Sequence, residues 1–399
     1  MTGKNESGPL VFLIAGEPSG DVLGARLMAA LSRRTGGTVR FAGIGGERMM
    51  EQGLDPLFPL DELALFGLAE LLPKLPSLIR RLGQTADAIR QARPDVVVTI
   101  DAPDFCFRVA KRIRAEGIPV VHYVAPTVWA WRPGRARKLA GLVDHLLALL
   151  PFEPPYFHRE GLACTFVGHP VVETGAGQGD GARLRARYGI APDAPLVCVL
   201  PGSRNSEVSR LLPVFGTTLA LLAERHPGLR AVVPTVPQMS GRVRAAAASW
   251  SVPTVVVEGD EGKYDAMAAS TVALAASGTV ALELALSRLP AVIAYRLHPV
   301  TVALYRRLIR VKYANLVNIM LDRMLVPELL QEECTPDRLA AALSTLLDDP
   351  AARRVQIEGV SEVARWLGHG GPGPSERAAE VVLGVVAGTT AEMKGERRP

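Results

Sequence analysis

The sequence predicts an α/β protein built from two Rossmann-like domains that face a central cleft. Three observations lead to this expectation: the chain has 399 residues, short apolar runs alternate with amphipathic helical segments, and the alternation stops at a glycine-rich stretch and then restarts. A chain of this length normally divides into two domains, because a single hydrophobic core stops growing at about 250–300 residues. Runs that are apolar at successive positions are typical of parallel strands covered by helices on both faces.

Each expected strand is a short apolar run followed by a helix-like segment. In the first half these runs span residues 10–14, 39–43, 96–100, 120–124 and 146–149. In the second half they span residues 196–200, 229–233, 254–257, 272–275 and 291–295. Ligands of such sheets bind beyond the carboxyl ends of the strands, so the loops that follow the strands are the expected places for chemistry.

A glycine-rich stretch that starts at Glu173 has no apolar period and is interpreted as the linker between the domains. We therefore expect an N-terminal domain over residues 1–173, a C-terminal domain over residues 184–350 and a helical segment over residues 351–399. A Gly-Pro break at residues 370–374 divides this last segment into two predicted helices.

The composition is that of a globular cytoplasmic protein. Hydrophobic residues make up 48% and charged residues 21% of the chain, and the net charge is +5. This modest charge is compatible with anionic lipid or phosphate, but the aromatic-rich basic pattern of RNA-binding proteins is absent, so no nucleic-acid partner is expected. The four cysteines form no Cys-x-x-Cys pair, and neither a signal peptide nor a transmembrane segment is predicted.

Two loops of the first half carry carboxylates at strand ends. Residues 15–21 read Ala-Gly-Glu-Pro-Ser-Gly-Asp, where glycines let a ligand approach, but the fingerprint Gly-x-Gly-x-x-Gly of dinucleotide-binding proteins is absent. Asp101 and Asp104 follow another strand, where aliphatic neighbours could raise the pKa of one carboxyl group and make it a general base. Helix capping by Ser19, Asp21 or Asp104 is the alternative interpretation.

A third loop, at residues 122–132, combines Trp129, Trp131 and Arg132 with a run of further basic residues. Aromatic faces bind sugar rings, and guanidinium groups bind phosphate. Two tryptophans so close together are also typical of a hydrophobic core, and this alternative stays open.

Two loops of the second half are suited to a diphosphate. Gly202, Ser203 and Arg204 follow a strand and open a helix, which brings a guanidinium group within reach of phosphate. Residues 275–284, Ala-Ala-Ser-Gly-Thr-Val-Ala-Leu-Glu-Leu, place a small-residue turn before a helix that contains Glu283. The N–H groups and dipole of the helix start favour an anion, and Glu283 could accept ribose hydroxyls. A plain turn and an ordinary capped helix are the alternatives.

In this order the motifs closely resemble those of the lipid-A-disaccharide synthases over nearly the whole chain. The resemblance is carried by Asn315 and by residues 15–21, 43–49, 100–105, 122–132, 150–153, 166–170, 200–204, 276–279 and 328–334. It implies a GT-B-type inverting glycosyltransferase that uses no metal or other cofactor. The implied reaction transfers 2,3-diacylglucosamine from UDP-2,3-diacylglucosamine to 2,3-diacylglucosamine 1-phosphate, giving a β-1,6-linked disaccharide 1-phosphate and UDP.

The resemblance also implies roles for individual residues. The catalytic residues would be Asp101, as base or orienter of the acceptor hydroxyl, together with Arg204 and Glu17. The donor site would consist of Gly202, Ser203, Arg204, Ser277, Gly278, Thr279, Glu283 and Asn315. The acceptor site would include Ser19, Asp21, Trp129 and Arg132. Two arrangements of the C-terminal helices at 351–399 are compatible with the resemblance: packing back on the N-terminal domain, or exchange between the subunits of a homodimer.

Acylated substrates would bring such an enzyme to the inner face of the cytoplasmic membrane as a peripheral protein. Residues 63–81 form a leucine-rich segment with Lys74, Arg80 and Arg81 beside the apolar positions, which is typical of a segment that enters the lipid interface. The expected membrane contacts are Leu65, Phe66, Leu68, Leu71, Leu72 and Leu75. A buried helix of the first domain is the alternative.

Two other classes of function share these sequence features. One is another UDP-sugar transferase or an epimerase of the same architecture; the epimerase would need no lipid acceptor and hence no apolar segment. The other is a non-catalytic protein that binds a nucleotide sugar or lipid and has no use for Asp101. A turnover assay distinguishes these alternatives from the implied reaction.

Overall fold

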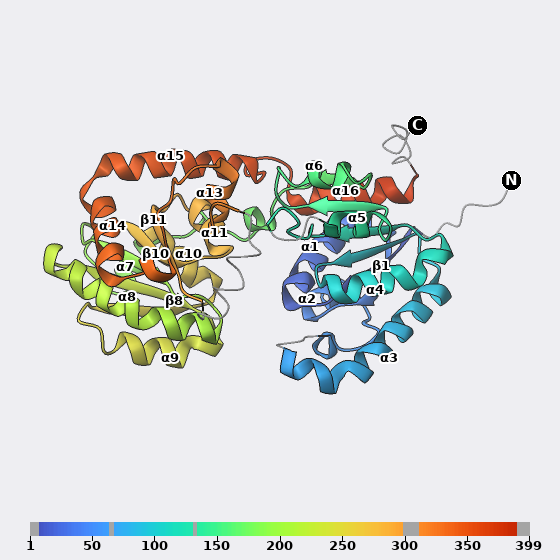
Figure 1. The fold of residues 1–399 in the computed structure, drawn as a ribbon, viewed down its shortest axis with the longest axis horizontal. Helices are drawn as coiled ribbons and strands as arrows, with labels where there is room; N and C mark the ends of the chain where they lie inside the picture. The colour runs from blue at the N-terminus through green and yellow to red at the C-terminus, as the bar shows by residue number, and fades with distance from the viewer. Residues whose placement is uncertain (1–7, 64–67, 131–133, 298–310, 389–399) are drawn as a thin grey trace. The chain divides into compact units, whose positions relative to one another are not determined.

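A computed structural model describes residues 8–63, 68–130, 134–297 and 311–388, with side chains for all of these except 68–75. The chain divides into two compact units, the first formed by Met1–Pro170 with Gly370–Pro399 and the second by Val171–His369 (Figure 1). Each unit contains a parallel β-sheet flanked by helices. The prediction of two Rossmann-like α/β units is therefore confirmed.

The described residues of the first unit form a sheet with the strand order β2-β1-β3-β4-β5-β6. Its strands are β1 (Leu10–Ala15), β2 (Arg40–Ile44), β3 (Val96–Ile100), β4 (Val120–Tyr123), β5 (His145–Ala148) and β6 (Ala163–Phe166). The central strand β3 is buried at every position, as its unbroken apolar sequence predicts. The sequence does not single out β6, because this short edge strand is mostly only partly buried and has no continuous apolar run.

Most helices of the first unit begin directly after a strand or a short loop. They are α1 (Pro18–Arg34), α2 (Glu47–Met50), α3 (Leu68–Ala92), α4 (Pro103–Ile113), α5 (Gly134–Ala140), α6 (Pro154–His158) and α16 (Pro374–Val386), with the 3-10 helices η1 (Leu60–Glu62) and η2 (Arg114–Glu116). Pro18, Pro103 and Pro154 each occupy the first helical position, where a missing N–H is tolerated and the fixed φ of proline suits the helix.

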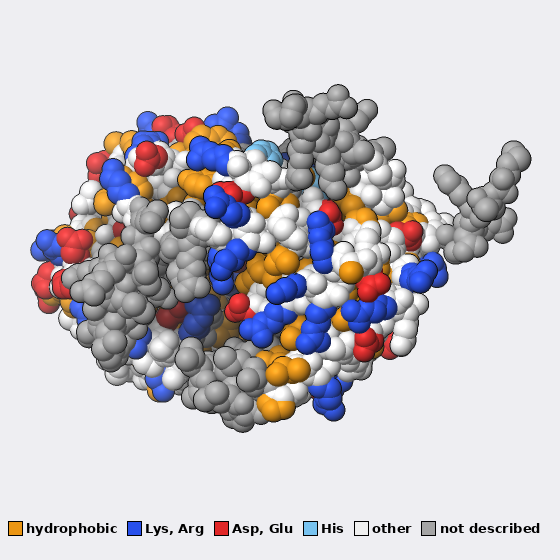
Figure 2. Space-filling view, turned by 45° about the vertical axis from the view of Figure 1, so that its right-hand side comes forward, with side chains coloured by type: hydrophobic (Ala, Val, Ile, Leu, Met, Phe, Trp, Pro, Cys, Tyr) orange, Lys and Arg blue, Asp and Glu red, His pale blue; other side chains and the backbone are white. Residues whose placement is uncertain are grey.

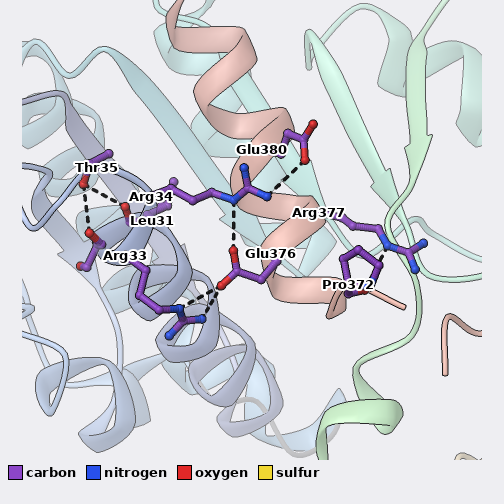
Figure 3. A network of polar contacts seen from close by, with 9 residues as sticks. Leu31, Arg33, Arg34, Thr35, Pro372, Glu376, Arg377 and Glu380 are labelled. Atoms are coloured by element: carbon purple, nitrogen blue, oxygen red, sulfur yellow. Dashed lines mark hydrogen bonds and ion pairs between the residues drawn. The ribbon is translucent and has the colours of Figure 1, made fainter. Parts of the chain in front are cut away.

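The last described helix, α16, belongs to the first unit although the chain before it belongs to the second. Ala379 and Val382 of α16 join the hydrophobic core of the first unit. On the surface, Glu376 accepts hydrogen bonds from Arg33 at 2.6 Å and from Arg34 at 3.1 Å, both at the end of α1 (Figure 3). Because partly exposed ion pairs stabilise proteins only weakly, the buried apolar face of α16 makes the larger contribution.

The sheet of the second unit has the strand order β12-β11-β10-β7-β8-β9 in the described residues. Its strands are β7 (Leu196–Leu200), β8 (Arg230–Thr235), β9 (Thr254–Glu258), β10 (Val272–Ala276), β11 (Ala291–Tyr295) and β12 (Glu328–Leu330). Strand β12 has only three residues, so it is too short to give a sequence signal.

The helices of the second unit surround this sheet (Figure 1). They are α7 (Gly181–Arg187), α8 (Asn205–Arg225), α9 (Pro237–Ala247), α10 (Gly259–Ala269), α11 (Val280–Leu286), α13 (Leu316–Leu321), α14 (Pro336–Asp348) and α15 (Pro350–Trp366), with η3 (Pro170–Glu173) and η4 (Gln331–Glu333).

The glycine-rich stretch interpreted as a linker packs against α10. The backbone N–H of Asp180 donates to Asp265 Oδ1 at 2.7 Å, and Arg183 Nε donates to Asp265 Oδ2 at 2.8 Å. Asp180 also caps α7 by accepting the N–H of Arg183 at 2.9 Å. These bonds attach the end of the stretch to the second unit.

Candidate functional site

The second unit contains a pocket at the carboxyl end of its sheet. The pocket has a volume of about 600 Å³ and is formed by the loops and helix starts that follow β7, β8, β9 and β10. It is lined by Leu200, Gly202, Ser203, Arg204, Glu207, Pro234, Thr235, Val236, Pro237, Gly259, Asp260, Lys263, Ala276, Ser277, Gly278, Thr279, Val280 and Glu283. Parallel strands end at one edge of a sheet, so segments far apart in the sequence meet here.

Seven of the eight residues predicted to bind the donor line this pocket. They are Gly202, Ser203, Arg204, Ser277, Gly278, Thr279 and Glu283. In the loop after β7, Gly202 has a φ of 103°, in the left-handed region that favours glycine. A Cβ atom at this position would lie 2.7 Å from Glu207 Oε2, so glycine also permits the close approach of this loop to Glu207.

Arg204 lies at the start of α8 on the pocket wall. Its Nη1 donates to Glu207 Oε1 at 3.0 Å, while 78% of its side chain is exposed. Glu207 is buried and also accepts a hydrogen bond from the Tyr295 hydroxyl at 3.2 Å. The buried carboxylate therefore holds one edge of a guanidinium group that remains accessible to an anion in the pocket.

Glu283 is held by two side chains of α10 that sequence analysis missed. Lys263 Nζ lies 2.8 Å from Glu283 Oε1, and the Tyr264 hydroxyl donates to the same oxygen at 3.2 Å. Burial lowers the pKa of Lys263, but the ion pair with Glu283 outweighs it and the pKa is raised overall. The Gly-Asp-Glu-Gly-Lys start of α10 is typical of a solvated helix, and only its place directly after a strand could have indicated this role.

Asn315, the eighth predicted donor residue, is buried outside the pocket lining. Its Oδ1 accepts the N–H of Val317 at 2.9 Å and caps α13, while its backbone N–H donates to Glu328 at 3.0 Å. The preceding residue, Ala314, accepts a hydrogen bond from the Ser277 hydroxyl at 3.3 Å, which connects this segment to the pocket.

Three buried polar atoms of the second unit have no hydrogen-bond partner within the described chain, and Nε of Arg230, on β8, is one of them. The other two are Oγ1 of Thr235, a residue that lines the pocket, and Nδ2 of Asn315. An unpaired buried polar atom is unfavourable by about 1–3 kcal/mol, so the Thr235 hydroxyl is suited to a hydrogen bond with a ligand.

In the first unit, the loops after β1 and β3 are in close contact. A Cβ atom on Gly16 would lie 2.2 Å from the Ala102 Cβ, so only glycine allows the two loops to pass at this distance. Asp101 and Ala102 have φ values of 50° and 41°, which are uncommon for residues other than glycine and often occur at functional sites. Burial raises the pKa of Asp101, and the backbone N–H of Ala102 partly offsets this effect.

The polar residues that follow β1 differ in their surroundings. Glu17 and Ser19 are exposed, whereas Asp21 is buried. The Asp21 carboxylate accepts backbone N–H groups from Gly46 at 2.7 Å and from two residues of α2 at 3.0 and 3.1 Å. Asp21 thus acts as a helix cap, but the helix that it caps is α2 rather than its own helix α1.

Trp129, after β4, is positioned by a buried carboxyl group that sequence analysis did not assign. The Trp129 indole N–H donates to Glu153 Oε1 at 3.1 Å, and the backbone N–H groups of Leu149 and Leu150 donate to Glu153 Oε2 at 3.1 and 2.9 Å. The available signal was that Glu153 ends the motif at residues 150–153, which follows a predicted strand. Arg132, also predicted to bind the acceptor, lies outside the described residues.

Glu153 makes the stability of the protein depend on pH. Burial raises its pKa to about 7, although hydrogen bonds from Leu150, Trp129 and Leu149 act in the opposite direction. Below the unfolded-state pKa the carboxyl group is neutral in both states. Between that value and about pH 7 the carboxyl group is ionised in the unfolded protein but still protonated in the folded one, so the free energy of unfolding falls relative to that of Glu153→Gln.

We expect this relative loss to reach about 3 kcal/mol, because one pKa unit corresponds to about 1.4 kcal/mol. Urea unfolding of both proteins between about pH 4.5 and pH 7.5 measures it. Glu51→Gln, at an exposed carboxylate of the same unit, is the matched control. A difference between wild type and Glu153→Gln that stays constant across this pH range would contradict the prediction.

The predicted membrane-contact residues fall on a part of the chain that is only partly described. Leu65 and Phe66 lie outside the described residues, and Leu68, Leu71, Leu72 and Leu75 belong to α3 without described side chains. Farther along α3, Ile79 is 51% exposed. No helix in the described ranges is long and apolar enough to cross a membrane. The same ranges contain no group of three His, Cys, Asp or Glu side chains suited to a metal ion.

The chain has the GT-B-type fold, which has two α/β units that each contain a parallel sheet and which glycosyltransferases share with UDP-sugar epimerases. The fold is similar to UDP-GlcNAc 2-epimerase from Neisseria meningitidis bound to UDP-GlcNAc, with a TM-score of 0.64, 13% identity, and coverage of 94% of this chain and 99% of that chain. It is also similar to MurG from Acinetobacter baumannii, with a TM-score of 0.60, 16% identity and the same coverage.

Sequence comparison identifies the particular family. The chain belongs to the lipid-A-disaccharide synthetase family, whose model matches residues 11–368. It is 68% identical over 379 residues to the lipid-A-disaccharide synthase of Rhodospirillum centenum, covering 94% of each chain. It is 53% identical over 378 residues to that of Paramagnetospirillum magneticum, covering 94% of this chain and 97% of the relative. The resemblance stated from the sequence motifs is thereby confirmed.

Proposed function

We propose that this protein transfers 2,3-diacylglucosamine from UDP-2,3-diacylglucosamine to the 6-hydroxyl of 2,3-diacylglucosamine 1-phosphate. The products are the β-1,6-linked disaccharide 1-phosphate and UDP. Membership of the lipid-A-disaccharide synthetase family over residues 11–368 supports this reaction. The single structural observation that carries the proposal is the pocket of about 600 Å³ at the strand ends of the second unit, which is suited in size to a nucleotide sugar.

The pocket supplies groups for each part of a UDP donor. The guanidinium of Arg204 binds the diphosphate and stabilises the negative charge that develops as UDP leaves. The turn at Ser277, Gly278 and Thr279 follows β10 and lies against the same phosphates. Glu283 accepts the ribose hydroxyls, and the unpartnered hydroxyl of Thr235 is a further hydrogen-bonding group for the nucleotide.

Asp101 is the proposed base for the acceptor hydroxyl. Inversion needs a single in-line displacement, in which the acceptor oxygen attacks the anomeric carbon and its proton passes to a carboxylate. Partial burial raises the pKa of Asp101 and makes its ionised form a stronger proton acceptor. The left-handed backbone at Asp101 and the contact of Gly16 with Ala102 fix the place of this carboxylate.

Other residues of the first unit would line the acceptor site. Glu17, before α1, and Ser19, in its first turn, are exposed, and Trp129 is held by Glu153 at the neighbouring strand ends. We keep Arg132 as a candidate for the acceptor phosphate. Asp21 would support the site indirectly, because its carboxylate is bonded to the backbone at the start of α2.

Incubation of the purified protein with UDP-2,3-diacylglucosamine tests the proposal. We expect UDP and disaccharide to form only when the monosaccharide 1-phosphate acceptor is present, and to form equally with and without a chelator. UDP release without acceptor would favour the epimerase alternative. Tight UDP binding without any turnover would favour a non-catalytic binding protein.

We further propose that the first unit contacts the membrane peripherally through α3. Ile79 of α3 is 51% exposed, and the neighbouring Arg80 is also exposed. On the surface of the first unit, Lys and Arg side chains lie among hydrophobic ones (Figure 2). This combination favours an interface between acyl chains and anionic head groups. A homodimer is compatible with the family, and sedimentation velocity would detect it.

Replacing Leu71, Leu72, Leu75 and Ile79 of α3 by Ser should reduce binding to vesicles that contain anionic lipid by about tenfold or more, because each buried CH₂ contributes about 0.8 kcal/mol. Flotation of vesicles with bound protein measures this change. Val355→Ser, at a 57% exposed residue of the second unit, is the matched control. Equal flotation of the α3 variant and the control would contradict a membrane role for this helix.

A further inference from the structure

The two carboxylate oxygens of Glu283 have different surroundings. Lys263 Nζ at 2.8 Å and the Tyr264 hydroxyl at 3.2 Å both contact Oε1. In the described part of the chain, Oε2 receives no side-chain hydrogen bond, while Glu283 itself lines the pocket. The two donors therefore restrict the rotation of the carboxylate and leave one oxygen for a ligand.

Both donors come from α10, which begins directly after β9 at the pocket edge. Tyr264 is buried, and the Lys263 side chain is only 23% exposed, so both are held in place by packing. Lys263 Nζ also lies 3.2 Å from Asp260 Oδ1, a residue with an 84% exposed side chain. Burial raises the pKa of Tyr264, which keeps its hydroxyl protonated as a donor.

A carboxylate with one oxygen already hydrogen-bonded can accept hydrogen bonds from neighbouring hydroxyl groups through its other oxygen. A carboxylate is only a hydrogen-bond acceptor, and the vicinal hydroxyls of a ribose are two donors at short separation. Glu283 is partly buried, and such an oriented acceptor discriminates against a ligand that lacks the matching hydroxyl, because the acceptor then stays unpaired.

We infer that Lys263 and Tyr264 are positioning residues that orient Glu283 toward the ribose of the nucleotide and thereby make the pocket selective for a ribonucleoside diphosphate over its 2′-deoxy analogue. This inference rests on the proposed nucleotide pocket. It adds a specificity function for two residues that do not themselves need to contact the ribose.

Calorimetric titration with UDP and with 2′-deoxy-UDP tests the inference. We expect wild type to bind UDP about tenfold or more tightly than 2′-deoxy-UDP, since a hydrogen bond to a charged group contributes about 1.5–3 kcal/mol. Lys263→Met and Tyr264→Phe should each reduce this preference several-fold. Tyr264→Phe removes only a hydroxyl group and keeps the test valid if Lys263→Met fails to fold. Lys111→Met, on the exposed face of α4, is the control.

The ratio of the two affinities separates positioning from simple charge attraction. If Lys263 acts only by attracting the diphosphate, Lys263→Met will weaken UDP and 2′-deoxy-UDP equally, and an unchanged ratio in both variants would overturn the inference. If wild type binds neither nucleotide, the proposed donor pocket itself is wrong. If wild type binds UDP and both variants keep its ratio of affinities for UDP and 2′-deoxy-UDP, the inference is wrong but the proposed function stands.

Discussion

Asp101→Asn is expected to lower the turnover number by about 10²–10⁴-fold, the range in which a positioned general base contributes to catalysis. Asparagine has nearly the same shape but cannot take the proton of the acceptor hydroxyl. It also tolerates the left-handed conformation in which residue 101 lies, so the variant should fold. Steady-state formation of the disaccharide measures the loss, and calorimetry should show an unchanged affinity for UDP.

A nearby carboxylate supplies the control for this experiment. Asp104 lies three residues farther along the chain, with 92% of its side chain exposed, and Asp104→Asn should retain turnover within a few-fold. The pH dependence gives a second criterion. Because burial raises the pKa of Asp101, wild-type turnover should fall as acid protonates this group. Retention of more than about a tenth of the activity by Asp101→Asn would exclude it as the base.

Arg204→Ala is expected to lower kcat/KM for the donor by about 10²–10³-fold and to weaken UDP binding as well. In other enzymes, removal of a hydrogen-bond donor that stabilises negative charge in the transition state has an effect of this size. The Arg204 side chain is 78% exposed, and Glu207 keeps its hydrogen bond from Tyr295 when this side chain is removed, so the fold should persist. Initial rates at varied donor concentration and calorimetry with UDP measure the two effects.

Arg210→Ala, on the same helix α8 but outside the pocket lining, is the matched control and should leave both quantities unchanged. Arg204→Lys should recover only part of the activity, because an ammonium group cannot form two parallel hydrogen bonds to phosphate. If Arg204→Ala leaves both the UDP affinity and kcat/KM unchanged, the assignment of Arg204 to the donor site is wrong.

The hydrogen bonds of Glu153 depend on the contact between two loops of the first unit. Its carboxylate joins Trp129, which follows β4, to the backbone that follows β5. Each of these segments can be recognised separately as a loop after a strand. Their connection depends on the adjacency of β4 and β5 in the sheet, and local periodicity contains no information on strand order.

The sequence alone determined the fold class and many of the residues that line the pocket of the second unit. Continuous apolar runs indicate parallel strands, parallel strands end at a common edge, and the loops at Gly202 and Ser277 therefore had to be candidates for one site. Tertiary structure decided which other side chains join them. Lys263 reaches Glu283 because β9 and β10 bring α10 and α11 to that edge, and Asp21 caps a helix that begins 26 residues later. Such contacts depend on the packing of separate elements, whose geometry no local sequence pattern specifies.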